Sequence, residues 1–85
     1  MSQGRVAVEV DPAWPEGAEE DEGVVVDWFV REGASVEEGG TLCTIQVEKV
    51  SVDVPAPVGG TLAEVAVGED ETFERGDTLA WIETG

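Results

Sequence analysis

The chain has 85 residues, 41% of them hydrophobic, and it carries 20 Asp and Glu against 4 Lys and Arg, for a formal net charge of -16. This length allows one small domain with a core near the lower limit of stability, so a single domain over residues 1–85 is expected. The strongly negative charge excludes nucleic acids and anionic membranes as favourable partners.

Apolar residues alternate along the chain, which is typical of β-strands with one buried side, and helical periodicity is absent. The first strand is predicted around Val6–Val10 and ends at Asp11, where an acidic loop rich in Pro and Gly begins. Further strands are predicted, in chain order, over Val24–Val30, Leu42–Val47, Val50–Val54, Thr61–Val67 and Leu79–Glu83. No segment favours a helix of ordinary length, so the fold is predicted to be all-β.

Two segments of the chain resemble each other at an offset of 37 positions, from Gly23 to Gly60. The preceding strands, VAVEV and VSVDV, match as well. Two similar units that each expose an apolar face can bury these faces against each other. A small sandwich or flattened barrel with approximate two-fold symmetry is therefore predicted. Identical pairs include Val30 with Val67, Gly39 with Gly76, Leu42 with Leu79 and Ile45 with Ile82.

This symmetry makes two predictions about position. Adding 37 to Lys49 gives a position beyond the end of the chain, so Lys49 and the termini are expected at opposite ends of the molecule. The loop Asp11–Glu22 is longer than its counterpart Pro55–Gly59, and it is the main asymmetry between the halves.

Lys49, the only lysine of the chain, lies between two of the predicted strands. If Glu48 and Lys49 form a two-residue hairpin loop, one face of the hairpin is apolar and the other is polar, which specifies the register. Cys43 falls on the apolar face and is expected to be a small core residue rather than a nucleophile. The predicted pairs are Val47 with Val50, Gln46 with Ser51, Ile45 with Val52, Thr44 with Asp53 and Cys43 with Val54.

The residues of this turn are unusual for a hairpin. Two-residue loops favour Asn-Gly or another pair with glycine, because their central residues often need a positive φ. Glu48-Lys49 breaks this rule among otherwise consistent signals, which makes the turn a candidate functional feature. A lysine at a hairpin tip is open to a modifying enzyme, whereas a Schiff-base lysine usually needs desolvation. Covalent attachment to Lys49 is one interpretation, and a solvated turn residue is the other.

The run WFVREGASVEEGGTLCTIQVEKVSVDVPAPVGGTL resembles the lipoyl domain of 2-oxo acid dehydrogenase complexes. It combines an apolar strand containing a Trp, then Gly33, then a Val and Gly-Gly turn, and finally an acid–lysine pair at a hairpin tip. The resemblance implies two four-stranded antiparallel sheets with pseudo-two-fold symmetry. It also implies that Lys49 carries lipoic acid in amide linkage, with Glu48, where the family usually has Asp, and Val50 as the flanks of the turn.

By this resemblance the chain is a swinging-arm carrier and not an enzyme. A lipoate ligase or lipoyl transferase would modify Lys49. The arm would then serve a thiamine-diphosphate decarboxylase, an acyltransferase and a flavin-dependent dihydrolipoamide dehydrogenase. The chain has no His to act as the general base of the acyltransferase, so it is expected to be a free-standing carrier or a domain of a longer chain, and Met1 favours the former.

Two alternatives to the lipoyl carrier remain. A biotin carrier domain has the same fold, but its lysine lies between methionines, whereas the sole methionine here is Met1. The other alternative is an unmodified acidic β-module that binds a protein partner.

The resemblance implies that the loop Asp11–Glu22 lies near the lysine turn and helps partner enzymes to recognise the domain. Trp14 would be its apolar anchor, and Glu19, Glu20 and Asp21 its acidic part. The alternative is a solvated loop with Trp14 packed against the barrel. The acidic run lacks the alternating ligands of a Ca²⁺ loop, so no metal site is expected. Trp28 and Trp81 lie within predicted strands and are expected in the core.

The cellular setting is inferred from composition. There is no apolar run of membrane-spanning length and no signal peptide at the N-terminus, and a lone Cys suits a reducing compartment, so a cytoplasmic location is expected. An excess of carboxylates repels itself unless salt screens it. We therefore hypothesise a high-salt cytoplasm, as in a halophile, with an ordinary acidic domain as the alternative.

Overall fold

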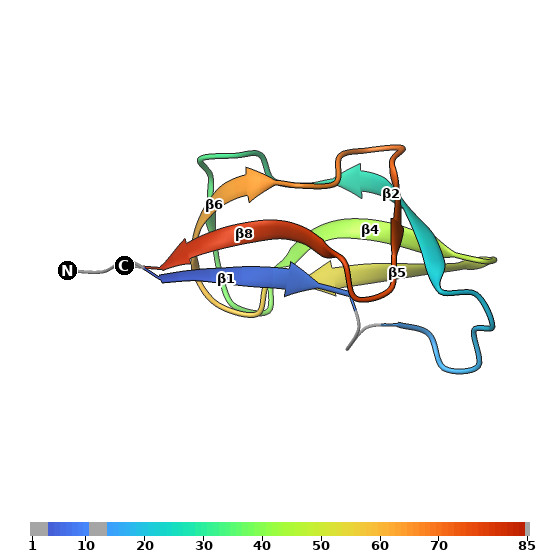
Figure 1. Ribbon diagram of the computed structural model, residues 1–85. Coiled ribbons are helices and arrows are strands. Elements are labelled where there is room, and N and C mark those ends of the chain that lie inside the picture. Colours follow the sequence, from blue (N-terminus) through green and yellow to red (C-terminus); the bar gives the residue numbers. More distant parts are fainter. Residues whose placement is uncertain (1–3, 11–13, 85) are drawn as a thin grey trace.

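The computed structural model describes residues 4–10 and 14–84, which form two four-stranded antiparallel sheets packed face to face (Figure 1). In spatial order, the first sheet contains β1 (Gly4–Glu9), β8 (Thr78–Thr84), β6 (Gly60–Val65) and β3 (Ser35–Val36). The second contains β5 (Val50–Pro55), β4 (Thr41–Val47), β2 (Glu22–Trp28) and β7 (Thr72–Glu74). The predicted all-β flattened barrel is therefore confirmed. Within the described ranges, no helix has the length and apolarity needed to cross a membrane.

The two sheets repeat each other under the offset of 37 residues. Shifting β4 by 37 gives the bounds of β8, and the same shift carries β2 onto β6 and β3 onto β7. The irregularities repeat too. Val26 interrupts the pairing of β2 with β4, and Ala63, 37 residues later, interrupts the pairing of β6 with β8. The two-fold symmetry predicted from the sequence repeat thus extends to single-residue β-bulges.

Two short strands were absent from the sequence prediction. β3 has two residues and β7 has three, which is too short for an alternating pattern to appear. Each nevertheless contributes one buried side chain, Val36 and Phe73, and each completes the edge of a sheet. The strand expected to reach Val30 ends instead at Trp28.

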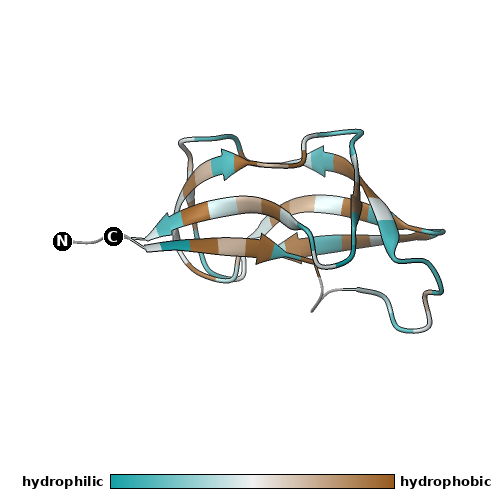
Figure 2. Cartoon of the chain, in the orientation of Figure 1, coloured by the Kyte–Doolittle hydropathy of each residue, from teal (hydrophilic) through white to brown (hydrophobic). Residues whose placement is uncertain are grey.

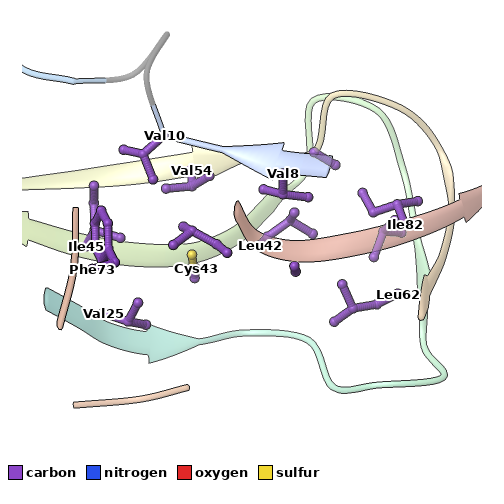
Figure 3. Packing of buried hydrophobic residues seen from close by; sticks show 14 of the residues in the cluster. Val8, Val10, Val25, Leu42, Cys43, Ile45, Val54, Leu62, Phe73 and Ile82 are labelled. Carbon is purple, nitrogen blue, oxygen red and sulfur yellow. The ribbon is translucent and has the colours of Figure 1, made fainter. Parts of the chain in front are cut away.

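The core between the sheets is apolar, and no polar or charged residue is buried in the part of the chain that the structure describes. Hydrophobic and hydrophilic positions alternate along the strands (Figure 2). Figure 3 shows buried side chains from both sheets, among them Ile45 of β4 beside Phe73 of β7, and Val8 and Ile82 from the other sheet. Burying a side chain of this kind stabilises the fold by about 1.5–3 kcal/mol. The largest fully buried residues are Val8, Val10, Val25, Leu42, Cys43, Ile45, Val47, Val54, Leu62, Leu79 and Ile82.

Trp28 and Trp81 are half-buried, so the expectation that they form part of the core is only partly correct. The indole N–H of Trp28 donates a hydrogen bond of 2.8 Å to the carbonyl of Val67. An indole at the margin of the core can keep this donor paired, whereas full burial would require a partner inside an apolar region.

The lysine turn and the paired strand ends lie at opposite ends of the molecule. Gly4 of β1 pairs with Thr84 of β8 at one end, and the turn between β4 and β5 projects from the other (Figure 1). The position predicted from the symmetry is therefore confirmed.

Candidate functional site

The hairpin that carries Lys49 has the register predicted from its apolar and polar pairs. Val47 pairs with Val50, Ile45 with Val52 and Cys43 with Val54. On the polar face, the Thr44 hydroxyl donates a hydrogen bond of 3.1 Å to Asp53 Oδ1. Cross-strand pairs of this kind fix the hairpin, and with it the position of the turn.

The turn reaches its tight geometry through Glu48, which has a φ of 58°. Only a few per cent of residues other than glycine adopt this left-handed conformation. The side-chain amide of Gln46 donates to the backbone carbonyl of Glu48 at 3.3 Å and supports the turn from the polar face. Glu-Lys is a poor turn pair because one residue must take a positive φ, and here Glu48 does so at a cost in backbone strain. The hydrogen bond from Gln46 helps to hold this conformation.

Lys49 and Val50 both face solvent at the tip. Val50 is 46% exposed, so the last apolar pair of the hairpin is buried only on the side of Val47. Lys49 is exposed, and within the described residues its amine has no hydrogen bond or ion pair. The amine is sterically open, as attachment by an enzyme requires.

Glu48 does more than flank the lysine. Its Oε2 accepts hydrogen bonds from the backbone N–H groups of Glu19 at 2.7 Å and Glu20 at 3.1 Å. The carboxylate beside Lys49 thus fastens the end of the β1–β2 loop, just before β2 begins, to the hairpin tip. The resemblance implied that this loop lies near the lysine turn, but sequence reasoning did not identify Glu48 as the residue that joins the two segments.

The described part of the β1–β2 loop, residues 14–21, begins with a buried anchor. The Trp14 side chain is only 7% exposed and packs edge-on against Phe73, with ring centroids 6.0 Å apart. The Arg75 guanidinium carbon lies 5.7 Å from the centre of the Trp14 ring. Trp14 therefore packs against the barrel and presents little surface to a partner, as in the alternative that the sequence left open.

The acidic part of the loop has the opposite character. Glu19, Glu20 and Asp21 are exposed and lie on the same side of the molecule as the lysine turn. The portion of the proposed recognition loop at residues 11–13 lies outside the described residues. A shallow open groove beside the tip has an acidic wall and is lined by Glu20, Glu22, Gly23, Val24, Gln46, Glu48 and Thr72. No set of three side chains in the described ranges is arranged to hold a metal ion.

Cys43 is fully buried behind the hairpin. Burial raises the pKa of its thiol from 9.0 to about 12, and the nearby Asp53 carboxylate adds to the rise. A thiol that stays protonated is a poor nucleophile and metal ligand, so Cys43 serves the core, as the hairpin register predicted.

Comparison with known proteins identifies relatives over most of the chain. Residues 14–82 match the Biotin_lipoyl family model, which is described as "Biotin-requiring enzyme". Over 62 residues the chain is 40% identical to the dihydrolipoyllysine-residue acetyltransferase component of the pyruvate dehydrogenase complex of Staphylococcus aureus, and 39% identical to that of Staphylococcus epidermidis. Each match covers 73% of this chain but only 14% of the relative.

Solved structures with the same fold include both lipoyl and carboxylase proteins. The lipoyl domain of the 2-oxoglutarate dehydrogenase complex from Azotobacter vinelandii superposes with a TM-score of 0.69 at 28% identity, covering 93% of this chain and 98% of that domain. A single-chain, multi-domain long-chain acyl-CoA carboxylase gives a TM-score of 0.74 at 23% identity, covering 95% of this chain and 7% of that protein. The second likeness concerns the fold alone.

Proposed function

The chain belongs to the Biotin_lipoyl family, and on that premise we propose that it is a lipoyl carrier domain whose Lys49 holds lipoic acid in amide linkage. The observation that carries the proposal is an exposed amine on the only lysine of the chain, held at the tip of a hairpin with a fixed register and without a partner among residues 4–10 and 14–84. The 40% identity to dihydrolipoyllysine-residue acetyltransferases supports lipoic acid as the attached group.

The chain itself contributes position rather than chemistry. Lipoic acid supplies the dithiolane that accepts an acyl group and electrons. The hairpin holds the Lys49 amine away from the barrel. The buried side chains of the paired strands β4 and β5 anchor the turn to the core. A tethered arm on a defined platform reaches successive active sites at a high effective concentration.

The proposed partners follow from this role. A lipoate ligase or lipoyl transferase would attach the group. A thiamine-diphosphate decarboxylase, an acyltransferase and a flavin-dependent dihydrolipoamide dehydrogenase of a cytoplasmic 2-oxo acid dehydrogenase complex would use it. The domain is not catalytic in this scheme. The exposure of the Lys49 amine and of the acidic loop beside it supports the proposal that this end of the domain binds these enzymes one after another.

A biotin carrier is the second candidate, because the matching family model is described as "Biotin-requiring enzyme". The residues beside the lysine favour lipoic acid. Lys49 lies between Glu48 and Val50, whereas biotin carriers resembling this fold have methionines at these positions.

Intact mass of the protein purified from its native host tests the assignment. We expect the lipoyl mass increment on Lys49 and none in the Lys49→Arg variant, which keeps the charge but removes the only side-chain amine. A biotin increment would replace the proposal with the biotin carrier. An unmodified native protein would favour an acidic module that binds a partner without a cofactor.

A further inference from the structure

The contact between Glu48 and the β1–β2 loop joins two segments that are distant in the sequence. Two consecutive backbone N–H groups, those of Glu19 and Glu20, converge on a single oxygen of Glu48 at 2.7 and 3.1 Å. Hydrogen bonds to a carboxylate are shorter and stronger than bonds between neutral groups. Glu48 also carries the positive φ of the turn, so its backbone and its side chain both shape the tip.

The loop is held at its two ends by different contacts. Trp14 packs on Phe73 and under Arg75 at the start, and the backbone N–H of Arg75 donates to the Asp21 carbonyl at 2.6 Å at the end. Between these ends, the hydrogen bonds that join the described loop residues to the hairpin are those to Glu48. Loss of the Glu48 carboxylate would therefore release the backbone at Glu19 and Glu20, while the packing of Trp14 and Ala18 on the core and the barrel itself stay in place.

The surroundings of Glu48 make this contact specific rather than a general attraction. The neighbouring loop side chains are carboxylates, and Glu20 and Glu22 line the same groove as Glu48. Carboxylates that are close together repel one another. The Glu48 carboxylate nevertheless points toward the loop, because the backbone N–H groups of Glu19 and Glu20 donate hydrogen bonds to it.

We propose that Glu48 is a positioning residue that latches the β1–β2 loop to the lysine turn, so that an enzyme acting on the arm of Lys49 meets the tip and the acidic loop as one surface. This inference rests on the proposed lipoyl function. It predicts a division between partners. An enzyme that reads both segments, the acylating decarboxylase, depends on the latch, whereas an enzyme that needs only the exposed amine, the lipoate ligase, does not.

The latch itself is tested without any cofactor, by amide hydrogen exchange on the 85-residue chain. In Glu48→Ala we expect the amides of Glu19 and Glu20 to exchange at least about tenfold faster, while core amides stay protected. Glu48→Gln keeps an acceptor oxygen at the same reach and should show an intermediate effect. Glu38→Ala is the matched control, because it removes one exposed carboxylate at the opposite end of β4 and its side chain makes no hydrogen bond among the described residues.

The coupling to function is tested on the same variants after lipoylation in vitro. In Glu48→Ala we expect the KM of the decarboxylase for the lipoylated chain to rise about tenfold with little change in kcat, and the rate of lipoylation to stay within about threefold of wild type. Glu48→Gln should partly restore KM, and Glu38→Ala should match wild type in both assays.

The outcomes separate the two proposals. Unchanged exchange at Glu19 and Glu20 in Glu48→Ala would overturn the latch. Faster exchange with an unchanged KM would overturn its role in recognition. If the wild-type chain accepts no lipoyl group, the proposed function and the recognition role fall together, while the exchange measurement still decides whether the latch exists.

Discussion

At the scale of single residues, Glu48 and Lys49 occupy one turn but have opposite surroundings. The Glu48 side chain is fixed by two backbone donors, whereas the Lys49 amine has no partner in the described structure. A tip of this kind combines a hydrogen-bonded carboxylate with an exposed cation. The sequence predicted the position and exposure of Lys49, because hairpin pairs define a turn. It could not predict the partners of Glu48, because a carboxylate can accept hydrogen bonds from any nearby backbone.

Cys43 gives a prediction at the same scale. Because burial raises the pKa of its thiol to about 12, against 9.0 for the unperturbed group, the folded protein keeps this proton where the unfolded chain loses it. The contribution of the protonated Cys43 thiol to the free energy of unfolding is therefore complete below pH 9.0, and it is lost as the pH rises from 9.0 toward about 12. Urea denaturation should show a wild-type midpoint that falls more steeply above pH 9.0 than that of Cys43→Ala, which lacks the thiol.

Alkylation kinetics provide a second measurement on Cys43. At pH 9.0 the folded protein should react with iodoacetamide at least about a hundredfold more slowly than the urea-unfolded chain, because it contains little thiolate and the side chain is fully buried. Equal labelling rates in the two states, or identical pH slopes for wild type and Cys43→Ala, would contradict this account.

At the scale of elements, the repeat determines which glycines the barrel needs. Gly23 begins the close approach of β2 to β7, and Gly60 occupies the same place in β6. A Cβ on Gly23 would lie 2.9 Å from Cζ of Phe73, while a Cβ on Gly60 would overlap the backbone carbonyl of Glu83. A Cβ on Gly23 would also lie 3.1 Å from the backbone carbonyl oxygen of Gln46, so both equivalent sites require glycine, and the approach is closest at Gly60.

Substitution of the adjacent residues Gly59 and Gly60 should show that the requirement for glycine is specific to the close approach at Gly60. Gly60→Ala is expected to lower the free energy of unfolding by about 1–3 kcal/mol or more, because the β6–β8 pairing must open to admit the methyl group. Gly59→Ala should change it by no more than about 0.5 kcal/mol, since its Cβ would find only ordinary contacts of 3.5 Å and beyond. Urea unfolding of both variants measures the difference. Equal losses would mean that the close approach at Gly60 is not what demands glycine.

At the scale of the whole molecule, only 4 Lys and Arg are available to neutralise 20 Asp and Glu, which leaves the net charge of -16. One ion pair within the described residues joins Arg5 Nη1 to Glu64 Oε1 at 3.7 Å, and both side chains are about half exposed. Exposed pairs of this kind contribute little. The apolar core must therefore offset the mutual repulsion of the carboxylates unless salt screens it, which is the physical basis of the high-salt hypothesis.

A salt series tests this balance. Because the Debye length falls from about 10 Å at 0.1 M to about 3 Å at 1 M, the melting temperature should rise with NaCl over this range. A variant with Glu16, Glu37 and Glu38 replaced by Gln should melt higher in dilute buffer and gain less from salt. These carboxylates are exposed and make no side-chain hydrogen bond in the described structure. Equal or greater stability of the wild type in dilute buffer would refute the hypothesis.

The sequence predicted most of the fold because the chain repeats its own pattern. The alternation around Ile45 determined the register of the hairpin, and the offset of 37 residues predicted the symmetry of the sheets. β3 and β7 were missed because two or three residues carry no periodicity. The burial of Trp14 was not decided by the sequence, because an aromatic residue in a loop can face either the core or a partner, and only the position of Phe73 settles the choice.

The pairing at the far end of the barrel has a consequence for chain connectivity. Gly4 faces Thr84 across β1 and β8 in the same way that Val50 faces Val47 across β5 and β4. A two-residue turn already links the second pair, so an equally short turn between Thr84 and Gly4 would close the backbone into a ring without altering either sheet. Placing a lysine in that new turn would give a circular carrier with an arm at each pole, and cyclisation would also restrict the unfolded chain.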